Sequence, residues 1–284
     1  MFETPPTFVG LAAAAAVVAA CASQPPPASA PVAEPTTLAQ TLPLGGRATY
    51  TIVDSAYIEA DGERVRFRTR VGYEAEVRMR FRTDGDDLVA TASLSRLEGL
   101  LENPTTGTVA TSLDDVDGDW VASIERDGTV VSLETPVLTD RFREVVGTED
   151  LLRGLFVSLP DAPVTEGSQW VDTLRTRDVG AGVRRTTTIV ARSRVAERAT
   201  VAGRPVLILE SVLDLDTRAE TEPGATEPSA QTLRGTLRRR TTWDAGLRRL
   251  THYRATGRLV GRLEVEGLEP IPLSADLVRE VTAR

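Results

Sequence analysis

The chain has 284 residues, and its 33 basic and 41 acidic residues give a formal net charge of −8 at pH 7. This acidic balance argues against a general nucleic-acid-binding protein, which normally has a basic excess. The length is sufficient for one large domain or two small ones that bury a hydrophobic core without disulfides. The sole cysteine, Cys21, also excludes an internal disulfide.

The first predicted element is an export signal over residues 1–20. Residues 8–20 (FVGLAAAAAVVAA) are uncharged and apolar. This run has the length of a secretory hydrophobic region and is too short to cross a bilayer core of ~30 Å. The preceding segment MFETPPT departs from the usual pattern because it has no basic residue. The run nevertheless predicts export rather than a membrane-spanning helix.

The end of this run, VAAC at residues 18–21, resembles the lipobox of bacterial lipoproteins. The resemblance implies that Cys21 becomes the mature N-terminus and carries a thioether-linked diacylglycerol. Because each buried methylene contributes ~0.8 kcal/mol, several acyl chains would hold the protein on a membrane. Ala22 follows the cysteine, which by the same resemblance implies the outer membrane, facing the periplasm. The alternative is cleavage by an ordinary signal peptidase, which releases a soluble protein starting at Ser23.

A proline-rich segment follows the cysteine. Residues 24–43 contain six prolines and few apolar side chains. Such a composition favours a stiff, partly polyproline II spacer that extends ~3.1 Å per residue. We therefore predict that residues 21–43 form a lipidated tether and that residues 44–284 form the folded domain. The alternative is a disordered leader without a role.

Strand-like alternation dominates the chain after Leu44. In the segment ERVRFRTRV, Val65, Phe67 and Val71 alternate with arginines, as in a half-buried strand. The next run, YEAEVRMRFR, has the same period, and Asp-Gly and related turn signals recur between such runs. We predict a mainly β (α+β) fold built on a long, curved antiparallel sheet with one solvated face.

One region has helical spacing instead. Across residues 137–158 apolar side chains recur every three or four positions, and Gly147 predicts two short helices or one bent helix at about 139–157. The flanking segments, 44–136 and 159–284, echo each other weakly at an offset of roughly 119 residues. This echo predicts a single duplicated domain whose two similar halves are joined by the helix.

The order of these features carries a family resemblance. The lipobox, tether, long strands and central helix, followed by SLPDAPVTEGSQW and TTWDAGLRRLTHY, resemble a family of uncharacterised bacterial lipoproteins with two β halves. The resemblance covers residues 44–284. The layout is more distantly similar to the lipoprotein-carrier group, whose curved half-barrels enclose an apolar cavity closed by helices. That similarity rests on architecture and implies no site residue.

Catalytic and cofactor chemistry find little support in the sequence. His252 is the only histidine, which excludes a zinc site with two histidines, and no G-x-S-x-G segment is present for a Ser–His–Asp triad. We interpret His252 as an ordinary strand residue. We predict a non-enzymatic protein without a metal or another cofactor.

The densest acidic stretch is LDDVDGDW, which contains Asp114, Asp115, Asp117 and Asp119. Its spacing begins like an EF-hand loop, but Trp120 stands where that loop requires Gly and Arg126 where it requires Glu. The EF-hand is therefore excluded. A solvated turn is favoured, with a loose calcium site as the alternative.

Arginine rows occur at residues 64–70, 78–82 and 238–240. A charge row on a strand is usually its solvated face, and the alternative is a site for an anionic glycolipid or cell-wall polymer. All 33 basic residues are arginines, which we attribute to a GC-rich genome. Residues 216–235 have almost no apolar side chain and predict a mobile loop, with a partner-docking loop as the alternative.

The leading hypothesis is a membrane-anchored, non-catalytic envelope lipoprotein that binds a lipid or another amphipathic ligand on the concave apolar face of the sheet. The alternative is an envelope adaptor that holds another protein through a sheet edge or residues 216–235. The two differ in what fills the inner side of the sheet. A ligand binder leaves an apolar surface open there, whereas an adaptor has a packed core.

If Cys21 is lipidated, radiolabelled palmitate will enter the wild-type protein and not Cys21→Ser, because serine has no thiol for the thioether bond. The measurement is label in the protein band after growth of the expressing bacterium. Label in both proteins would contradict the lipidation of Cys21.

Overall fold

The computed structural model describes residues 35–43, 45–63, 66–104, 107–147, 150–160, 162–180, 183–221 and 229–284. The predicted signal peptide and Cys21 lie outside the described residues. In chain order the elements are β1 (Arg47–Asp61), β2 (Arg66–Asp84), β3 (Asp87–Asn103), β4 (Gly107–Ser112), the 3-10 turn η1 (Leu113–Asp115), β5 (Val116–Asp117), β6 (Trp120–Ile124), β7 (Val130–Glu134), β8 (Val137–Leu138), α1 (Asp140–Val145), α2 (Asp150–Arg153), β9 (Gln169–Gly180), β10 (Val183–Val201), β11 (Arg204–Thr221), β12 (Ser229–Asp244), β13 (Arg249–Val265) and β14 (Ile271–Ala283).

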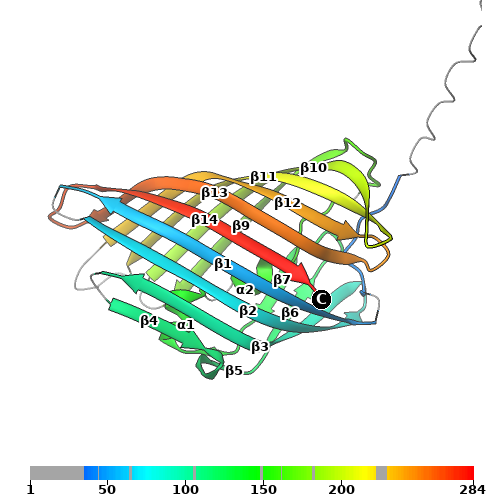
Figure 1. Ribbon diagram of the computed structural model, residues 1–284, viewed down its shortest axis with the longest axis horizontal. Helices are drawn as coiled ribbons and strands as arrows, with labels where there is room; N and C mark the ends of the chain where they lie inside the picture. The colour runs from blue at the N-terminus through cyan, green and yellow to red at the C-terminus, as the bar shows by residue number, and fades with distance from the viewer. Residues whose placement is uncertain are drawn as a thin grey trace, which may run out of the picture. The chain divides into compact units, whose positions relative to one another are not determined.

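Most of these strands form one antiparallel sheet (Figure 1). The sheet has 12 strands in the order β7-β6-β3-β2-β1-β14-β13-β12-β11-β10-β9, with β4 also paired to β3. The short strands β5 and β8 pair separately. The predicted mainly β fold with a long antiparallel sheet is confirmed.

The period-two pattern of the sequence gives the sheet two different faces. On β2, Ala75, Val77 and Met79 are buried, while Arg78 and Arg80 between and beside them are exposed. Successive side chains of a strand point to opposite faces of the sheet. We call the face that carries the core the inner face and the solvated one the outer face.

The pairing of β1 with β14 joins the two predicted halves. These strands are in register from the Tyr50–Ala283 pair to the Ala60–Leu273 pair, so the sheet continues from one half into the other. The hairpins β2–β3 and β10–β11 have matching positions along the chain. β2 and β3 begin at residues 66 and 87, and β10 and β11 begin at residues 183 and 204. The spacing is the same for both strands, and duplication itself stays a prediction.

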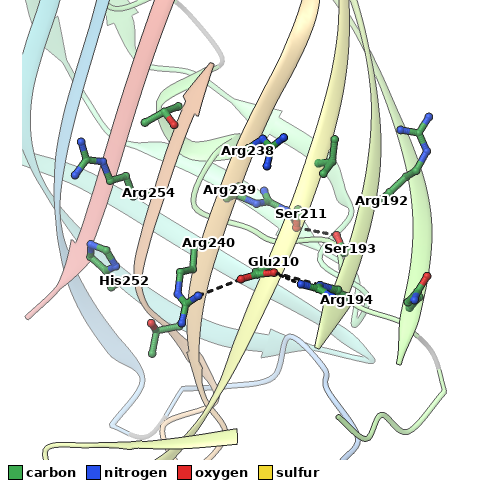
Figure 2. A pocket seen from close by; sticks show the side chains of 14 residues that line it. Arg192, Ser193, Arg194, Glu210, Ser211, Arg238, Arg239, Arg240, His252 and Arg254 are labelled. Carbon is green, nitrogen blue, oxygen red and sulfur yellow. Dashed lines mark hydrogen bonds and ion pairs between the residues drawn. The ribbon is translucent and has the colours of Figure 1, made fainter. Parts of the chain in front are cut away.

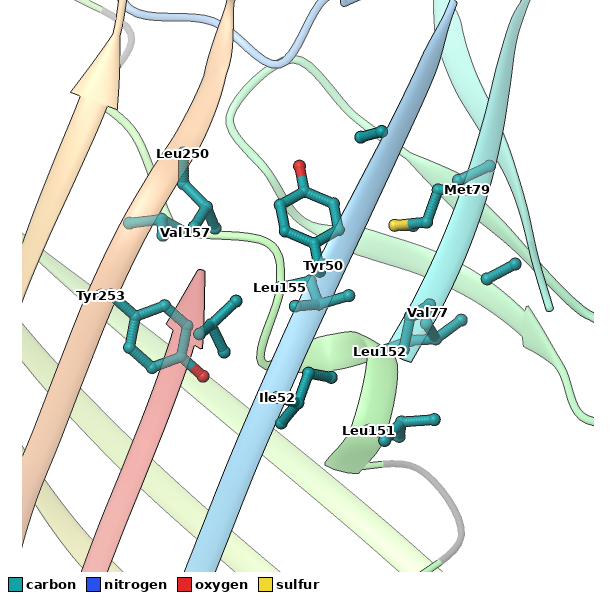
Figure 3. Packing of buried hydrophobic residues seen from close by; sticks show 14 of the residues in the cluster. Tyr50, Ile52, Val77, Met79, Leu151, Leu152, Leu155, Val157, Leu250 and Tyr253 are labelled. Atoms are coloured by element: carbon teal, nitrogen blue, oxygen red, sulfur yellow. The ribbon is translucent and has the colours of Figure 1, made fainter. Parts of the chain in front are cut away.

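The segment between β8 and β9, which contains α1 and α2, packs against one end of the inner face. Leu151, Leu152, Leu155 and Val157 are buried there. They belong to one hydrophobic cluster with side chains of β1, β2 and β13 (Figure 3), namely Tyr50, Ile52, Val77, Met79, Leu250 and Tyr253. At this end of the sheet the inner face is therefore a packed core.

The helical region is present but shorter than predicted. The hydroxyl of Thr139 accepts a hydrogen bond from Phe142 N and caps α1, which ends at Val145. Gly147 has a φ of 83°, a left-handed conformation that interrupts the helix. α2 is a single turn, and the chain continues without helix to residue 160. Of the two predicted alternatives, two short helices are confirmed. The apolar spacing beyond them reflects packing onto the sheet.

The folded part begins before the predicted end of the tether. Thr36 and Val164 exchange two backbone hydrogen bonds of 2.8 Å. Leu38 is buried in the core, and Gln40 N donates to Arg126 O at 2.7 Å. The last residues of the predicted tether therefore pack onto the domain, since Leu38 finds an apolar site that composition does not reveal.

The prediction of a mobile loop at residues 216–235 is wrong. β11 and β12 remain paired as far as the Glu220–Ala230 pair, and only residues 222–228 of the segment lie outside the described residues. The polar composition misled because these residues are the solvated ends of a long hairpin. Hydrogen bonds to β10 and β13, rather than deep burial, hold them in strands.

Three glycines of β12 and β13 lie where an added Cβ would overlap the facing strand. Three Leu–Gly pairs lie opposite each other across these strands: Leu233 with Gly261, Leu259 with Gly235, and Leu237 with Gly257. A Cβ atom on Gly261 would lie 1.7 Å from Thr232 O, where no side chain fits. Glycine within a strand marks such close backbone approaches and bends in a sheet. In one of these pairs the leucine side chain itself lies against the glycine, since a Cβ on Gly257 would come within 2.6 Å of Leu237 Cδ2.

Gly261→Ala is expected to lower the free energy of unfolding by about 1–3 kcal/mol, because β12 and β13 must separate to admit the methyl group. Gly72→Ala in β2 is the control, since an added Cβ there would come no closer than 3.0 Å to another atom. Urea unfolding followed by circular dichroism measures both variants. Equal losses of stability would contradict the tight contact.

Candidate functional site

His252 lies on the outer face of β13. Its Nε2 is 3.3 Å from Glu280 Oε1 on the neighbouring strand β14, and the two side chains are 42% and 43% exposed. This is a surface contact between adjacent strands, which fits the interpretation of His252 as an ordinary strand residue.

The acidic stretch around η1 does not gather its carboxylates. Asp115 is buried and accepts hydrogen bonds from Thr111 Oγ1 at 2.9 Å, Ser112 N at 3.1 Å and Thr139 Oγ1 at 2.8 Å. Arg141 adds an ion pair at 3.2 Å. Burial acts to raise the pKa of Asp115, but the three hydrogen bonds and Arg141 outweigh it and hold the pKa below its ordinary value.

Asp115 therefore ties β4 to the start of α1. No group of three or more His, Cys, Asp or Glu side chains suited to a metal ion occurs in the described part of the chain.

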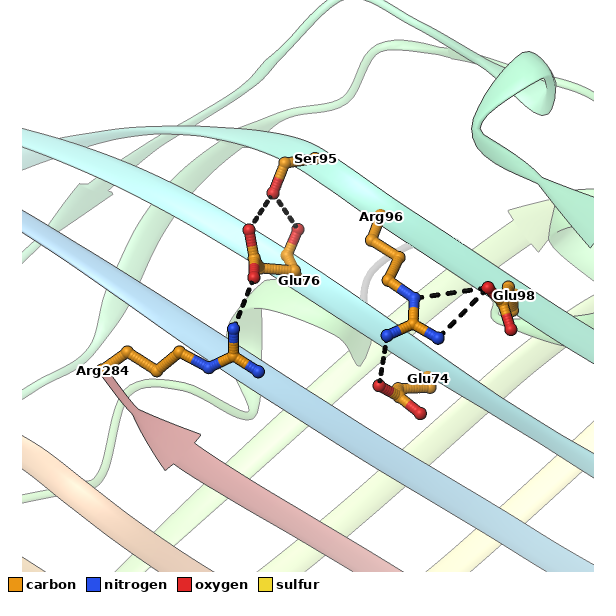
Figure 4. A network of polar contacts seen from close by, with 6 residues as sticks. All are labelled: Glu74, Glu76, Ser95, Arg96, Glu98 and Arg284. Atoms are coloured by element: carbon orange, nitrogen blue, oxygen red, sulfur yellow. Dashed lines mark hydrogen bonds and ion pairs between the residues drawn. The ribbon is translucent and has the colours of Figure 1, made fainter.

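Most of the arginines on the outer face of β2 have an acidic neighbour on the same face. Four of them form ion pairs: Arg66 with Asp61, Arg68 with Glu59, Arg78 with Glu76 and Arg82 with Asp84. Figure 4 shows the adjoining network, in which Arg96 contacts both Glu74 and Glu98 at 3.2 Å. This part of the outer face is the solvated surface that a charge row usually marks.

A second region of the outer face is hollowed and strongly basic. A hollow of about 870 Å³ lies over β9–β13 (Figure 2). We call it the arginine groove. Alternation along β10, β12 and β13 points five arginines into it, namely Arg192, Arg194, Arg238, Arg240 and Arg254. The lining also includes Arg239, Ser193 and Ser211, which alternation places on the inner face, and its only carboxylate is Glu210 of β11.

Glu210 fixes two of these arginines. Arg194 Nη2 lies 2.7 Å from its Oε2, and Arg240 Nη1 lies 3.0 Å from its Oε1. The hydrogen bond from Arg194, reinforced by the charges of both arginines, keeps the pKa of Glu210 below its ordinary value. The carboxylate of Glu210 therefore orients two guanidinium groups.

The remaining arginines of the groove differ in their partners. Arg192 pairs with Asp214 at the rim, and the pKa of Asp214 is lowered by that hydrogen bond. Arg238 and Arg254 form no ion pair with any described residue. The groove thus combines two arginines that Glu210 orients with two that have no ion pair among the described residues.

The inner face carries a row of side chains that crosses seven strands, six of which contribute a polar residue. We call it the inner polar row. Its members lie opposite one another in register from β2 to β10, and Ala255 of β13 separates the two arginines: Tyr73, Asp54, Arg279, Arg239, Ser211 and Ser193. Arg279 lies 3.5 Å from Asp54 Oδ2 and donates to Leu151 O in α2 at 3.2 Å. Gly154 leaves room for it, since a Cβ there would come within 2.6 Å of the guanidinium.

Arg239 is the unusual member of this row. Its Nη2 donates to Ser211 Oγ at 3.3 Å, and Ser211 Oγ in turn lies 2.8 Å from Ser193 Oγ. Its Nε is buried without a hydrogen-bond partner, and no described carboxylate pairs with it. Burial lowers the pKa of the Arg239 guanidinium. A half-buried cation without a counter-ion is only partly solvated, so this side chain is a candidate for binding an anion.

Sequence reasoning missed the inner polar row, although a signal was present. The run Arg238–Arg240 was treated as one row, yet alternation sends Arg239 to the face of Leu237 and Trp243. Asp54 likewise falls in phase with the buried Ile52. A single charge in phase with apolar residues was the pattern to look for.

Beyond the inner polar row, the inner face is apolar and differs from the packed core. A second hydrophobic cluster lies near the β1–β2 and β13–β14 turns. It consists of Ala60, Leu233, Leu259, Ile271, Leu273 and Ala275, with the partly exposed Ile58, Phe67, Leu215, Leu263 and Leu277 around them. We call it the distal apolar face. All its members come from strands of the sheet. The cluster at the packed end also includes residues between Leu138 and Val164, which we call the covering segment.

No helix among the described residues is both long enough and apolar enough to span a membrane. No family model and no curated protein matches the chain, so membership of a lipoprotein family stays a prediction.

Several solved structures are distantly similar to the chain. Neisserial surface protein A is 9% identical with a TM-score of 0.23 and covers 84% of this chain and 98% of its own. OccK5 (OpdH) of Pseudomonas aeruginosa is 8% identical with a TM-score of 0.28, covering 84% and 99%. A putative exported protein with a YmcC-like fold from Bacteroides fragilis is 11% identical with a TM-score of 0.24, covering 85% and 97%. Likeness at these TM-scores supports no statement about function.

Asp115→Asn is expected to reduce the free energy of unfolding by about 1–3 kcal/mol near neutral pH, because the amide nitrogen faces hydrogen-bond donors. Asp115 has a lowered pKa in the folded state, so its contribution is present above the unfolded value of about 3.9 and disappears as the pH falls through the folded pKa.

The difference between wild type and variant should therefore shrink on acidification. Urea titrations at about pH 7 and about pH 3 measure it, with the exposed Asp114→Asn as control. A difference that does not change with pH would contradict the charged role of Asp115.

Proposed function

We propose that this protein is an exported, lipid-anchored envelope protein that binds an amphipathic ligand on its inner face. The observation that carries the proposal is the distal apolar face, which is built from sheet residues alone while the other end of the same face is covered by residues 138–164. An apolar sheet face normally packs against another layer. The ligand supplies that layer at the distal end.

The chemistry of this face supports an elongated apolar group. Its partly exposed side chains are aliphatic apart from Phe67, and they come from β1, β2, β11, β13 and β14. Contact with such a surface is worth about 25 cal/mol per Å² of apolar area removed from water. The side chains around its buried members are half-buried, which leaves part of their apolar surface for a ligand to cover. An acyl chain matches both its composition and its extent along several strands.

The inner polar row supports an acidic head group on the same ligand. Arg239 has no carboxylate partner among the described residues, and its neighbours Ser193 and Ser211 provide hydroxyl groups. A carboxylate or phosphate beside Arg239 would supply the missing counter-ion through charge-assisted hydrogen bonds. The apolar tail would extend along the distal apolar face. The proposal includes no catalytic step.

The predicted lipobox supports the envelope location. A lipid anchor on Cys21 and the proline-rich segment before Thr36 would hold the folded part near a membrane that supplies amphipathic ligands.

An adaptor role is the second candidate, and one observation favours it. Among the described residues, β9 pairs on one side only, with β10, which leaves the backbone groups of Gln169–Gly180 available on the other side. A free edge strand is a template for adding a strand from a partner. Native mass spectrometry separates the two roles, because bound lipid favours the ligand binder and a bound protein favours the adaptor.

Replacing Leu215 and Leu263 together by glutamine is expected to weaken binding of a fluorescent long-chain fatty acid by about tenfold or more, since each leucine contributes on the order of 1.5 kcal/mol when fully covered. Both side chains are partly exposed, so folding tolerates the change better than at the buried leucines. Fluorescence titration gives the affinity.

The control is Val260→Gln, on the outer face of β13 and 56% exposed. It should bind the fatty acid like the wild type. Unchanged affinity in the double variant, with the fold intact by circular dichroism, would overturn the proposed ligand surface.

A further inference from the structure

We propose that the arginine groove on the outer face of β9–β13 is a second binding site and that it takes phosphate groups. Arg192, Arg194, Arg238, Arg240 and Arg254 lie on the opposite face of the sheet from the inner polar row, although the lining of the hollow also includes Arg239, Ser193 and Ser211 of that row. The groove shares no residue with the distal apolar face, so variants of its outward-pointing arginines test it separately from the proposed function.

The first argument is the balance of charge inside the groove. Five outward-pointing arginines line it together with a single carboxylate, Glu210, although the whole chain has a net charge of −8. Two of the arginines, Arg238 and Arg254, form no ion pair with a described residue. On β2, Arg66, Arg68, Arg78 and Arg82 each have an acid within 3.4 Å, and Arg70 and Arg80 have no ion pair with a described residue but line no such hollow. In the groove, Arg238 and Arg254 are the unpaired cations, with Glu280 of β14 opposite Arg254 in register.

The second argument is the placement of like charges. Arg240 on β12 and Arg254 on β13 are directly opposite in register, and Arg238 lies two residues from Arg240 on the same face. Like charges directly opposite each other destabilise a sheet. An anion that contacts both strands would remove this repulsion, and β-strand geometry places these Cβ atoms about 5 to 7 Å apart.

The third argument is that part of the groove is already oriented. Glu210 holds Arg194 and Arg240, while Arg240 also contacts Glu197 at 2.7 Å. A guanidinium group has five N–H donors, so these ion pairs leave donors free for a ligand. Because fixing a side chain in advance reduces the entropy lost on binding, the oriented arginines favour a specific site over a diffuse charged surface.

Phosphate suits this arrangement better than a single carboxylate does. Its oxygens are distributed tetrahedrally and accept from several arginines at once, often in bidentate pairs. The hydroxyls of Thr242 and Thr256 add neutral donors to the lining. A hollow of about 870 Å³ accommodates more than one phosphate group. The ligand class is therefore a molecule with adjacent phosphates or a surface that displays many of them.

Isothermal titration calorimetry of the full-length chain with inorganic tripolyphosphate tests the site. The double variant R238Q/R254Q should bind at least about tenfold more weakly than the wild type, and added salt should weaken the wild-type interaction steeply. The matched control is R70Q/R80Q, which removes the same charge from two exposed arginines on the outer face of β2. It should retain the wild-type affinity.

Equal losses in R238Q/R254Q and R70Q/R80Q would overturn the site, because net charge alone would then explain the binding. Equally tight binding of citrate would overturn the assignment to phosphate. Unaltered tripolyphosphate binding in the leucine double variant, which lacks Leu215 and Leu263, is expected and distinguishes this site from the inner face.

Vesicles separate the two sources of phosphate. If the source is a lipid head group, R238Q/R254Q will bind phosphatidylglycerol vesicles more weakly than R70Q/R80Q, and neither variant will differ on phosphatidylcholine vesicles. If the two variants bind phosphatidylglycerol equally while only tripolyphosphate binding falls, the groove takes a soluble phosphate. All variants share the same N-terminus, so any contribution of residues 1–34 cancels.

Discussion

The structure depends on the need to cover one apolar face of a very long sheet. Alternation along the strands gives the sheet an inner face that water does not solvate well. The chain provides its own cover at one end, where Leu151, Leu152 and Leu155 pack beneath the strands. At the other end the cluster contains strand residues alone. This unequal covering, rather than any reactive group, distinguishes the two ends of the molecule.

The inner polar row separates the packed core from the distal apolar face, so the two ends of the inner face are distinct. Arg279 contacts both Asp54 and the backbone of α2, so the covering segment is tied to the sheet at the same place where the polar row crosses it. Arg239 continues the row without an acidic partner among the described residues. An apolar surface that ends at a cation is complementary to an amphiphile with an acidic head group.

The outer face follows the same period-two rule with a different result. Over β2, four arginines form ordinary surface ion pairs, which contribute little individually. Over β10, β12 and β13 the arginines gather around Glu210, which contacts Arg194 and Arg240. Two parts of one solvated face, made from the same kinds of residue, therefore differ in how their arginines are arranged.

The sequence by itself determined the mainly β class and the position of the helical region, because period-two alternation, Asp-Gly turns and helical spacing are local properties. It could not determine that β1 pairs with β14, that residues 216–235 are mostly strand, or that Leu38 belongs to the core. Those features depend on contacts between residues far apart in the chain. Only the tertiary structure decided which arginines have partners, since cross-strand register, and not spacing along the sequence, brings Arg238, Glu210 and Arg254 together.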